Sequence, residues 1–120
     1  GLENVTVIFD DLFTVDLSLF PEADLILSNP PYINSQEIAT LQKEVLFEPS
    51  TALDGGEDGL MFYRCLANRW RDKVKKNGFM AFECGEEQSK AIIDIFNDKF
   101  VESNVIFDFN NIDRIVTFGI

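Results

Sequence analysis

Hydrophobic and polar residues follow two different periods along this chain, and the two periods alternate. Short runs of apolar and β-branched residues predict strands at Val5–Phe9, Asp24–Ser28, Phe79–Cys84, Val105–Phe109 and Ile115–Ile120. Between several of these runs, apolar residues recur at every third or fourth position, which indicates helices with one buried face. Alternating strands and helices, without a repeat or a linker, are typical of an α/β domain.

Three helices are predicted from this pattern. The first begins after Asn34, which forms a capping-box pattern with Glu37, and ends at Pro49; its apolar face comprises Ile38, Leu41 and Val45. The second ends at a left-handed stop at Asn77-Gly78, and its apolar face comprises Leu60, Tyr63, Ala67, Trp70 and Val74. The third begins with Glu86, Glu87 and Gln88 and buries Ala91, Ile92, Ile95 and Phe96.

The last two predicted strands are joined by the four residues 110–113. A connection of this length permits an antiparallel hairpin, whereas parallel pairing needs a crossover of about a dozen residues or more. The sequence therefore predicts that the final strand runs antiparallel to its neighbour.

The composition is that of one compact domain, with 46% hydrophobic residues in a chain of 120. No apolar run approaches the roughly 20 residues that span a bilayer, and no signal peptide opens the chain, so we expect a cytoplasmic location without membrane contact. Cys65 and Cys84 lie in apolar patterns without metal or redox spacing. We interpret them as reduced packing residues and predict no metal site.

The charge balance is strongly acidic, with 10 basic and 21 acidic residues and a net charge of −11. Such a surface repels a phosphate backbone, which argues against direct nucleic-acid binding and favours a protein partner, especially a basic one. The alternative interpretation is that the negative charge only keeps the protein soluble and selects no partner.

The tetrapeptide Asn29-Pro30-Pro31-Tyr32 directly follows the apolar run Leu25–Ser28. Because proline has no backbone N–H, the Pro30 carbonyl is not committed to a strand ladder and can accept a hydrogen from a ligand. Asn29 adds a side-chain acceptor, so the two could hold both hydrogens of a substrate NH2 while Tyr32 covers its flat face. The alternative interpretation is a turn that only terminates the strand.

An amide nitrogen held in this way is a poor nucleophile, because its lone pair is delocalised. The tetrapeptide suits a site that methylates such an amino group. Acceptors that stabilise the positive charge developing on the nitrogen during methyl transfer contribute about 3 kcal/mol each, and alignment of the nitrogen with the methyl donor supplies much of the remaining rate enhancement. No strong general base is then required, which fits a chain without histidine.

Several further segments accompany the tetrapeptide: Val7–Phe13, Leu25–Ile33, Glu44-Val45, Glu48-Pro49, Ala52–Leu60, Phe62–Arg64, Gly78–Gly85 and Asp113–Val116. Together they resemble the HemK family, the release factor glutamine methyltransferases, over essentially the whole chain. The Asn-Pro-Pro-Tyr motif alone is shared with DNA adenine, DNA cytosine and rRNA guanine methyltransferases. The segment Leu53–Leu60 discriminates better among these families.

The resemblance implies an S-adenosylmethionine-dependent enzyme that methylates the side-chain N5 of a glutamine in a peptide-chain release factor. It implies a Rossmann-like sheet with strand order 3-2-1-4-5-7-6, of which residues 1–120 would supply strands 3 to 7 and the antiparallel C-terminal hairpin. The chain would be the C-terminal part of the catalytic domain, without the N-terminal substrate domain and the glycine-rich cofactor motif. We expect such a fragment to be inactive by itself and to bind the cofactor weakly.

The resemblance also assigns site residues. Asn29, Pro30 and Tyr32 would be catalytic, and with Pro31 they would bind the substrate. Asp11 and Leu12 would lie against the adenine of S-adenosyl-L-methionine, with Asn29 on the same cofactor, although Asp11 could equally be a solvated turn or a cap. The glycine-rich loop Asp54–Gly59 is predicted to be a helix-entry loop with positive-φ positions.

Two rival interpretations remain open at this level. The same tetrapeptide would serve a nucleic-acid amino-group methyltransferase acting on N6 of adenine, N4 of cytosine or N2 of guanine, and a fragment could also be a non-catalytic binding module. Because Asp24–Ser28 would lose its neighbour when strands 1 and 2 are absent, its edge is expected to self-associate or to pair with Val5–Phe9.

Overall fold

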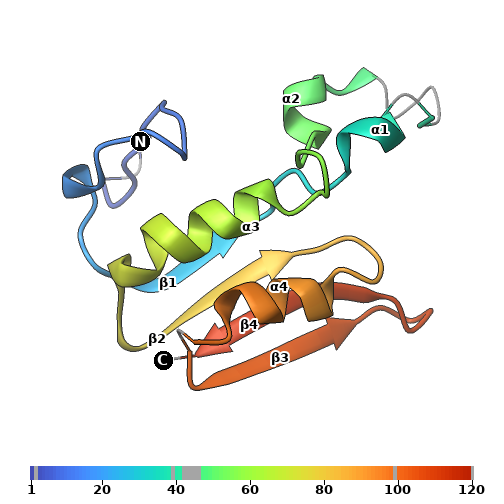
Figure 1. Ribbon diagram of the computed structural model, residues 1–120. Helices are drawn as coiled ribbons and strands as arrows, with labels where there is room; N and C mark the ends of the chain where they lie inside the picture. Colours follow the sequence, from blue (N-terminus) through green and yellow to red (C-terminus); the bar gives the residue numbers. More distant parts are fainter. Residues whose placement is uncertain (2, 39, 42–46, 99, 120) are drawn as a thin grey trace.

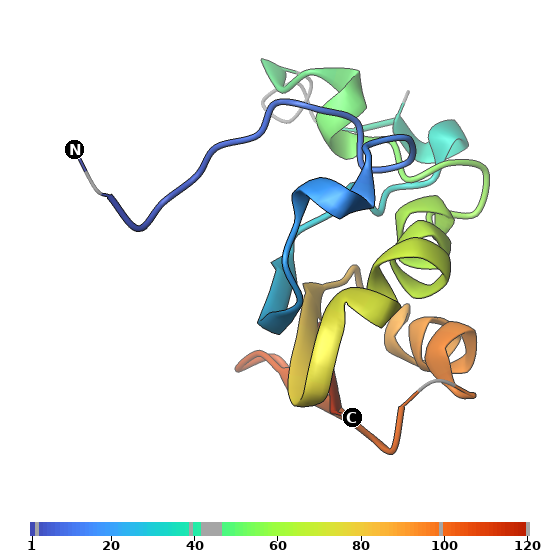
Figure 2. The ribbon, with the colours of Figure 1, turned by 90° about the vertical axis from the view of Figure 1, so that its left-hand side faces the viewer.

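Residues 1, 3–38, 40–41, 47–98 and 100–119 are described by the computed structural model of this chain. They form an α/β structure around one four-stranded mixed sheet with the strand order β1-β2-β4-β3. The strands are β1 (Ala23–Ser28), β2 (Val74–Glu83), β3 (Glu102–Phe107) and β4 (Asp113–Gly119). Helices α3 (Met61–Cys65) and α4 (Ser89–Phe96) lie on one face of this sheet, as Figures 1 and 2 show.

The pairing of the strands follows from the lengths of their connections. β1 and β2 are parallel and are joined by a long crossover that contains α3, whereas the short turn between β3 and β4 makes an antiparallel hairpin. β4 also pairs antiparallel with β2, so it lies between β2 and β3. The predicted C-terminal hairpin is therefore confirmed, and so is the predicted strand Asp24–Ser28.

The long helix between β1 and β2 is confirmed, but its predicted end is wrong. α3 continues through a π-helical stretch, η3 (Leu66–Trp70), and a 3-10 turn, η4 (Arg71–Lys73), and β2 begins at Val74. Asn77 has a φ of 67°, as a left-handed stop requires, yet it lies in an irregular part of β2 where the register with β1 shifts. Val74 is buried as a strand residue, because pairing with Ala23 extends the sheet beyond the predicted start at Phe79.

The predicted strand Val5–Phe9 is wrong, because these residues pair with no strand in the described part of the chain. Their side chains are exposed, and that of Phe9 is completely so. Alternating β-branched residues favour an extended backbone, but a strand forms only where a partner ladder is available. The alternative pairing of Val5–Phe9 with β1 is not formed either, and β1 stays at the edge of the sheet.

The helix predicted after Asn34 is observed as a short one, α1 (Ser35–Ile38). Its predicted cap is confirmed, since the backbone N–H of Glu37 donates to the Asn34 side chain over 2.9 Å. Val45 lies outside the described residues. A second short helix, α2 (Ser50–Leu53), follows Pro49 and was not predicted, because four residues are too few to show a helical period.

The core lies between α3, α4 and the inner face of β2 and β4. Its largest fully buried side chains include Tyr63, Phe82, Phe96 and Phe118, and the rings of Phe96 and Phe118 stack with centroids 4.4 Å apart. Cys65 and Cys84 are free and buried, as predicted for packing residues. Burial, with Asp113 nearby, raises the pKa of Cys84 to about 11, so its thiol is protonated at neutral pH.

Helices long and apolar enough to cross a membrane are absent from the described part of the chain. The longest regular helix that it contains, α4, spans eight residues.

Asp113 joins the sheet to α4 from the first position of β4. Its carboxylate accepts the backbone N–H of Glu87 over 2.7 Å and that of Ser89 over 2.9 Å, at the start of α4. Burial acts to raise the pKa of this carboxyl, but the hydrogen bonds from Ser89 and Glu87 outweigh it and leave the pKa below its usual value. The predicted start of this helix at Glu86–Gln88 is thus a capped turn that precedes Ser89.

Replacement of Asp113 by Ala should lower the free energy of unfolding by about 1–3 kcal/mol, because two N–H groups at a helix start lose their acceptor. The matched control is Asp94→Ala on the exposed side of α4. This substitution should change the free energy of unfolding by less than about 0.5 kcal/mol. Because the folded pKa is lowered, the contribution of Asp113 is present above pH of about 4 and is lost as the pH falls through the folded pKa. Urea unfolding at neutral and acidic pH measures both effects, and equal losses in the two variants would refute the capping role.

Candidate active site

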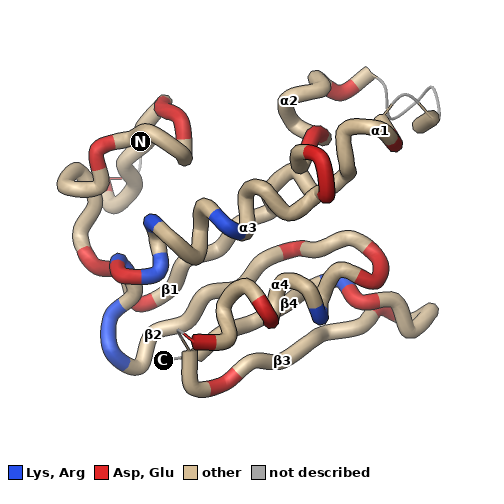
Figure 3. Tube along the Cα trace, viewed as in Figure 1, with Lys and Arg blue, Asp and Glu red and all other residues tan. Residues whose placement is uncertain are grey.

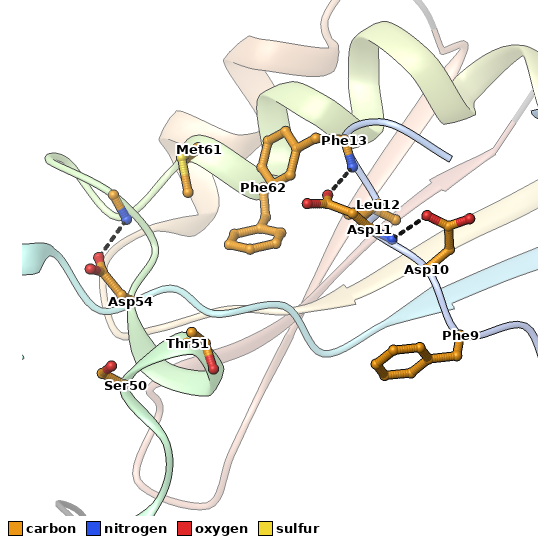
Figure 4. Close-up of a pocket in the computed structure, with 11 residues that line it drawn as sticks. Phe9, Asp10, Asp11, Leu12, Phe13, Ser50, Thr51, Asp54, Met61 and Phe62 are labelled. Atoms are coloured by element: carbon orange, nitrogen blue, oxygen red, sulfur yellow. Dashed lines mark hydrogen bonds between the residues drawn. The ribbon is translucent and has the colours of Figure 1, made fainter. Parts of the chain in front are cut away.

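A cleft with a volume of about 1050 Å³, open to solvent, lies between the N-terminal segment and the start of α3. Phe9–Phe13 form one wall, and residues of α2, of the loop after it and of the start of α3 form the other, as seen in Figure 4. The lining includes apolar side chains such as Leu12, Met61 and Phe62, and the carboxylates are those of Asp10, Asp11 and Asp54. Such a combination is typical of a site for a small organic ligand.

The wall that contains Asp11 and Leu12 is held by the end of the long helix. The Leu12 carbonyl accepts hydrogen bonds from Arg69 Nη1 over 2.6 Å and from Trp70 Nε1 over 3.1 Å, and Arg69 Nη2 also donates to the Val15 carbonyl. The residues 11–15 therefore have a fixed backbone although they belong to no regular element. Leu12 packs against the core from this position.

Asp11 is exposed at the rim of the cleft. One of its carboxylate oxygens accepts the backbone N–H of Phe13 over 2.7 Å, and its carbonyl accepts the N–H of Val15 over 2.8 Å. Asp11 is thus a turn residue, as the alternative interpretation held, but it also lines the cleft with Leu12. The hydrogen bond from Phe13 uses Oδ1 of the carboxylate and not Oδ2.

The turn Asn29–Tyr32 begins where β1 ends, and its four residues are exposed to different degrees. Asn29 is exposed, Pro30 is buried, and Pro31 and Tyr32 are half-buried. In the described part of the chain neither the Asn29 side chain nor the Pro30 carbonyl has a hydrogen-bond partner. Both acceptors are thus unpaired among the described residues, and their role in binding a substrate stays a prediction.

Two smaller pockets, each of about 310 Å³, meet at this turn. One contains all four residues of the turn together with Leu53 and Glu83, and the other lies on the opposite side of Asn29, between the ends of β1 and β2. Asn29 lines these two pockets, whereas Asp11 and Leu12 line the cleft. The segment from α2 to Asp54 separates the two sites, since Asp54 lines the cleft and Leu53 lines the pocket of the turn.

The loop Asp54–Gly59 is more than the helix-entry loop predicted from its glycines. The N–H of Ile33 donates to the Leu53 carbonyl over 3.1 Å, and the N–H of Gly55 donates to the Ile33 carbonyl over 2.7 Å. Positive φ values are found at Gly56 and Gly59, which confirms the prediction at two of the three glycines. The loop thus pairs with the residue that directly follows Tyr32 and holds the turn in place.

Gly55 and Gly59 allow this loop to approach the turn closely. A Cβ atom on Gly55 would lie 2.8 Å from Tyr32 Cα and 2.9 Å from the Pro31 carbonyl oxygen, and one on Gly59 would lie 2.5 Å from the Tyr32 carbonyl oxygen. These neighbours are backbone atoms, so a larger residue could be accommodated only if the turn moved.

Asp54 ties the same loop to the start of α1. Its carboxylate accepts the Ser35 hydroxyl over 2.7 Å and the Gly56 N–H over 2.9 Å, and these hydrogen bonds lower the pKa of Asp54. Asp58 is paired with Arg64, whose hydrogen bonds lower the pKa of Asp58 to about 2. Both carboxylates are therefore structural groups of the loop, and both are ionised at neutral pH.

Tyr32 is held at its hydroxyl and at its carbonyl by Glu83 and Gln88, to which the sequence analysis assigned no role in the site. Its hydroxyl donates to Glu83 Oε1 over 3.2 Å, and its carbonyl accepts from Gln88 Nε2 over 2.9 Å. Burial, together with the Glu83 carboxylate, raises the pKa of Tyr32. The polar residue Glu83 within an apolar strand was the available signal, but its partner lies 51 residues away in the sequence.

Comparisons with known proteins give a consistent result. The release factor glutamine methyltransferase of Clostridium acetobutylicum is 37% identical over 108 residues, which cover 88% of this chain and 38% of the relative. The protein of the same name from Fusobacterium nucleatum is 38% identical over 117 residues, covering 96% and 33%, and that from Bacillus subtilis is 37% identical over 116 residues, covering 94% and 40%. The chain matches the C-terminal part of these relatives and spans about two fifths of their length or less. No family model matches it.

Substitution of Gly55 by Ala should displace the turn Asn29–Tyr32 and lower the free energy of unfolding by about 1–3 kcal/mol, because the added methyl group meets backbone atoms. Gly119→Ala is the control, since its Cβ would lie 3.3 Å from the Phe79 ring, which can shift. Amide chemical shifts of Tyr32 and Ile33 should change in the first variant only. If both variants unfold alike and these amides do not shift, the loop does not hold the turn.

Proposed function

Since this chain is homologous to the C-terminal part of the release factor glutamine methyltransferases, we propose that the protein methylates the side-chain amide N5 of a glutamine in a peptide-chain release factor. S-adenosyl-L-methionine would supply the methyl group. The observation that carries the proposal is the turn Asn29–Tyr32, whose two free acceptors lie beside a half-buried aromatic ring, in a chain 35–43% identical to relatives of that name.

The turn has the groups that a primary amide requires. The Asn29 side-chain oxygen and the Pro30 carbonyl would each accept one hydrogen of the glutamine NH2, and the Tyr32 ring would pack on the amide plane. Positive charge develops on this nitrogen as the methyl group is transferred, so each acceptor stabilises the transition state more than the ground state. Pro30 and Pro31 would keep the geometry fixed, because each has a locked φ.

The cleft beside the turn fits the proposed cofactor. Its volume of about 1050 Å³ exceeds what a nucleoside-sized ligand needs, and Leu12, Met61 and Phe62 offer apolar surface for an adenine ring. The Asp11 carboxylate could accept a hydrogen from the adenine amino group. Asn29 would contact the cofactor at the point where it meets the glutamine.

The order of the strands supports the same proposal. The observed order β1-β2-β4-β3 agrees with the 4-5-7-6 part of the sheet that the family resemblance implies. In such a sheet, ligands lie outside the carboxyl ends of the parallel strands. Asn29 follows β1 and Glu83 ends β2, so both lie at that edge.

The distribution of charge favours a protein substrate over a nucleic acid. Lys and Arg gather where η4 passes into β2, at the end of the sheet away from α1 and α2, whereas Asp and Glu are spread over the rest of the chain, including α1, α2 and the adjoining loops, as Figure 3 shows. A negatively charged surface next to the site repels phosphate groups and attracts a basic protein. We therefore propose a release factor as the protein partner, and we propose a cytoplasmic location.

Replacement of Asn29 by Ala in the full-length protein should lower kcat for release-factor methylation by about 10²–10³-fold, as is typical for loss of one transition-state hydrogen bond. The dissociation constant of S-adenosylmethionine should change much less. Asn104→Ala on the exposed strand β3 is the control and should leave both unchanged. Parallel assays with release factor, DNA and rRNA test the substrate. Methylation of a nucleic acid instead of the release factor, or full activity of the Asn29 variant, contradicts the proposal.

We further propose that the open edge of β1 mediates self-association of the 120-residue chain. Leu25 and Leu27 are 51% and 69% exposed, and the outer backbone groups of this edge strand are available for pairing. Light scattering over a dilution series should show a mass that rises with concentration. Leu27→Lys should suppress that rise, because a charge on an edge strand opposes pairing. A monomer at all concentrations rules this interaction out.

A further inference from the structure

Tyr32 is connected to the end of β2 through its hydroxyl group. The donor–acceptor distance to Glu83 Oε1 is 3.2 Å, and the Gln88 side chain holds the Tyr32 carbonyl 2.9 Å away at the other end of the residue. The Gln88 side chain is itself fixed, because its Oε1 accepts the N–H of Gly85 over 2.9 Å. The backbone of Tyr32 and the tip of its ring are thus held by separate groups.

Glu83 is a rigid point of attachment. Its carbonyl accepts the hydroxyl of Tyr63 over 2.6 Å, and the Tyr63 side chain is completely buried in the core. The next residue, Cys84, is also completely buried and donates its N–H to the Arg114 carbonyl over 2.8 Å. A carboxylate on such a backbone has little freedom, which is what a group that orients another side chain requires.

Glu83 lies beside the turn Asn29–Tyr32, in the lining of the pockets there. Among the described residues, only Asn29 and Glu83 line both pockets that meet at the turn. The residues on either side of Glu83, Phe82 and Cys84, are buried in the core, whereas Glu83 lines the pocket of the turn. An acidic residue at this place in an otherwise apolar strand therefore has a partner in the site and none in the core.

We propose that Glu83 is a positioning residue for methyl transfer, which fixes the plane of the Tyr32 ring over the substrate amide by accepting the hydrogen bond of its hydroxyl group. This inference rests on the proposed function for the identity of the substrate. The contact between Glu83 and Tyr32 does not depend on that identity, and it can be measured separately. A misplaced ring would slow the reaction, since alignment of the amide with the methyl donor is a main source of the rate.

The kinetic test uses the full-length protein and three substitutions. Glu83→Leu removes the acceptor, Glu83→Gln keeps an acceptor oxygen of nearly the same shape, and Tyr32→Phe removes the donor. We expect Glu83→Leu and Tyr32→Phe each to lower kcat by about tenfold to a hundredfold with a smaller change in KM, and Glu83→Gln to retain most of the activity. The double variant Glu83→Leu with Tyr32→Phe should be no slower than either single variant, because both remove the same contact.

The second readout is the pKa of Tyr32, measured from the NMR chemical shift of its ¹³Cζ atom. This signal is assigned by its absence from the spectrum of Tyr32→Phe. The charged and titratable groups that act on this phenol are Glu83, Cys84 and Arg114, and Glu37, Glu86 and Glu87 line a pocket with Tyr32. Glu83→Leu should lower the pKa of Tyr32, because a neighbouring negative charge and an acceptor of its proton are lost. Glu86→Gln is the control for a carboxylate near the site without the hydrogen bond and should change this pKa less.

The outcomes separate the two claims. An unchanged Tyr32 pKa in Glu83→Leu, additive losses in the double variant, or equal losses in Glu83→Gln and Glu83→Leu would overturn the positioning role. If the wild-type protein does not methylate a release factor, the proposed function fails, and the pKa measurement alone decides whether Glu83 holds Tyr32.

Discussion

Pro30 and Pro31 leave the two central positions of the turn after β1 without a backbone donor, so groups from elsewhere in the chain contribute to fixing this turn. The loop after α2 pairs with Ile33, and the Gln88 side chain donates to the Tyr32 carbonyl. The hydroxyl of Tyr32 reaches the end of β2 at Glu83. The same lack of donors leaves the carbonyl of Pro30 uncommitted, and this is the property that suits it to hold a substrate hydrogen.

The two faces of the sheet differ in how far their side chains are buried. The face under α3 and α4 buries Met80, Phe82, Val116 and Phe118, and this core fixes the strand ends from which the site is built. The other face has exposed apolar side chains such as Leu27 and Phe79, and the pocket between Asn29 and Glu83 begins beside Leu27. A parallel pair such as β1 and β2 is normally covered on both faces, so these side chains are surface available for further packing.

Local signals predicted much of this fold. The short connection before β4 favours an antiparallel return, and the apolar period from Leu60 to Trp70 identifies the long helix. Val5–Phe9 has the composition of a strand but no partner, and Val74 joins β2 because Ala23 pairs with it. Each of these errors concerns a residue whose structure is decided by a distant segment, which periodicity does not detect.

The residues of the candidate site also fall into those that local sequence signals identify and those that they do not. Asn29, Pro30 and Tyr32 are adjacent in the sequence, so their chemistry could be recognised directly, and Asp11 and Leu12 were found through the family resemblance. Glu83 and Gln88 lie 51 and 56 residues from Tyr32, and Gly55 acts through the space it leaves free. These roles depend on close approach in three dimensions, and no spacing in the sequence encodes them.

A crystal structure of the full-length protein with S-adenosylhomocysteine and a glutamine-containing release-factor peptide tests the central claim most directly. The account predicts the glutamine NH2 within hydrogen-bond distance of both the Asn29 side-chain oxygen and the Pro30 carbonyl, with the Tyr32 ring against the amide plane and the adenine beside Asp11 and Leu12. A glutamine side chain bound elsewhere, with Asn29 and Pro30 still solvated, would contradict it.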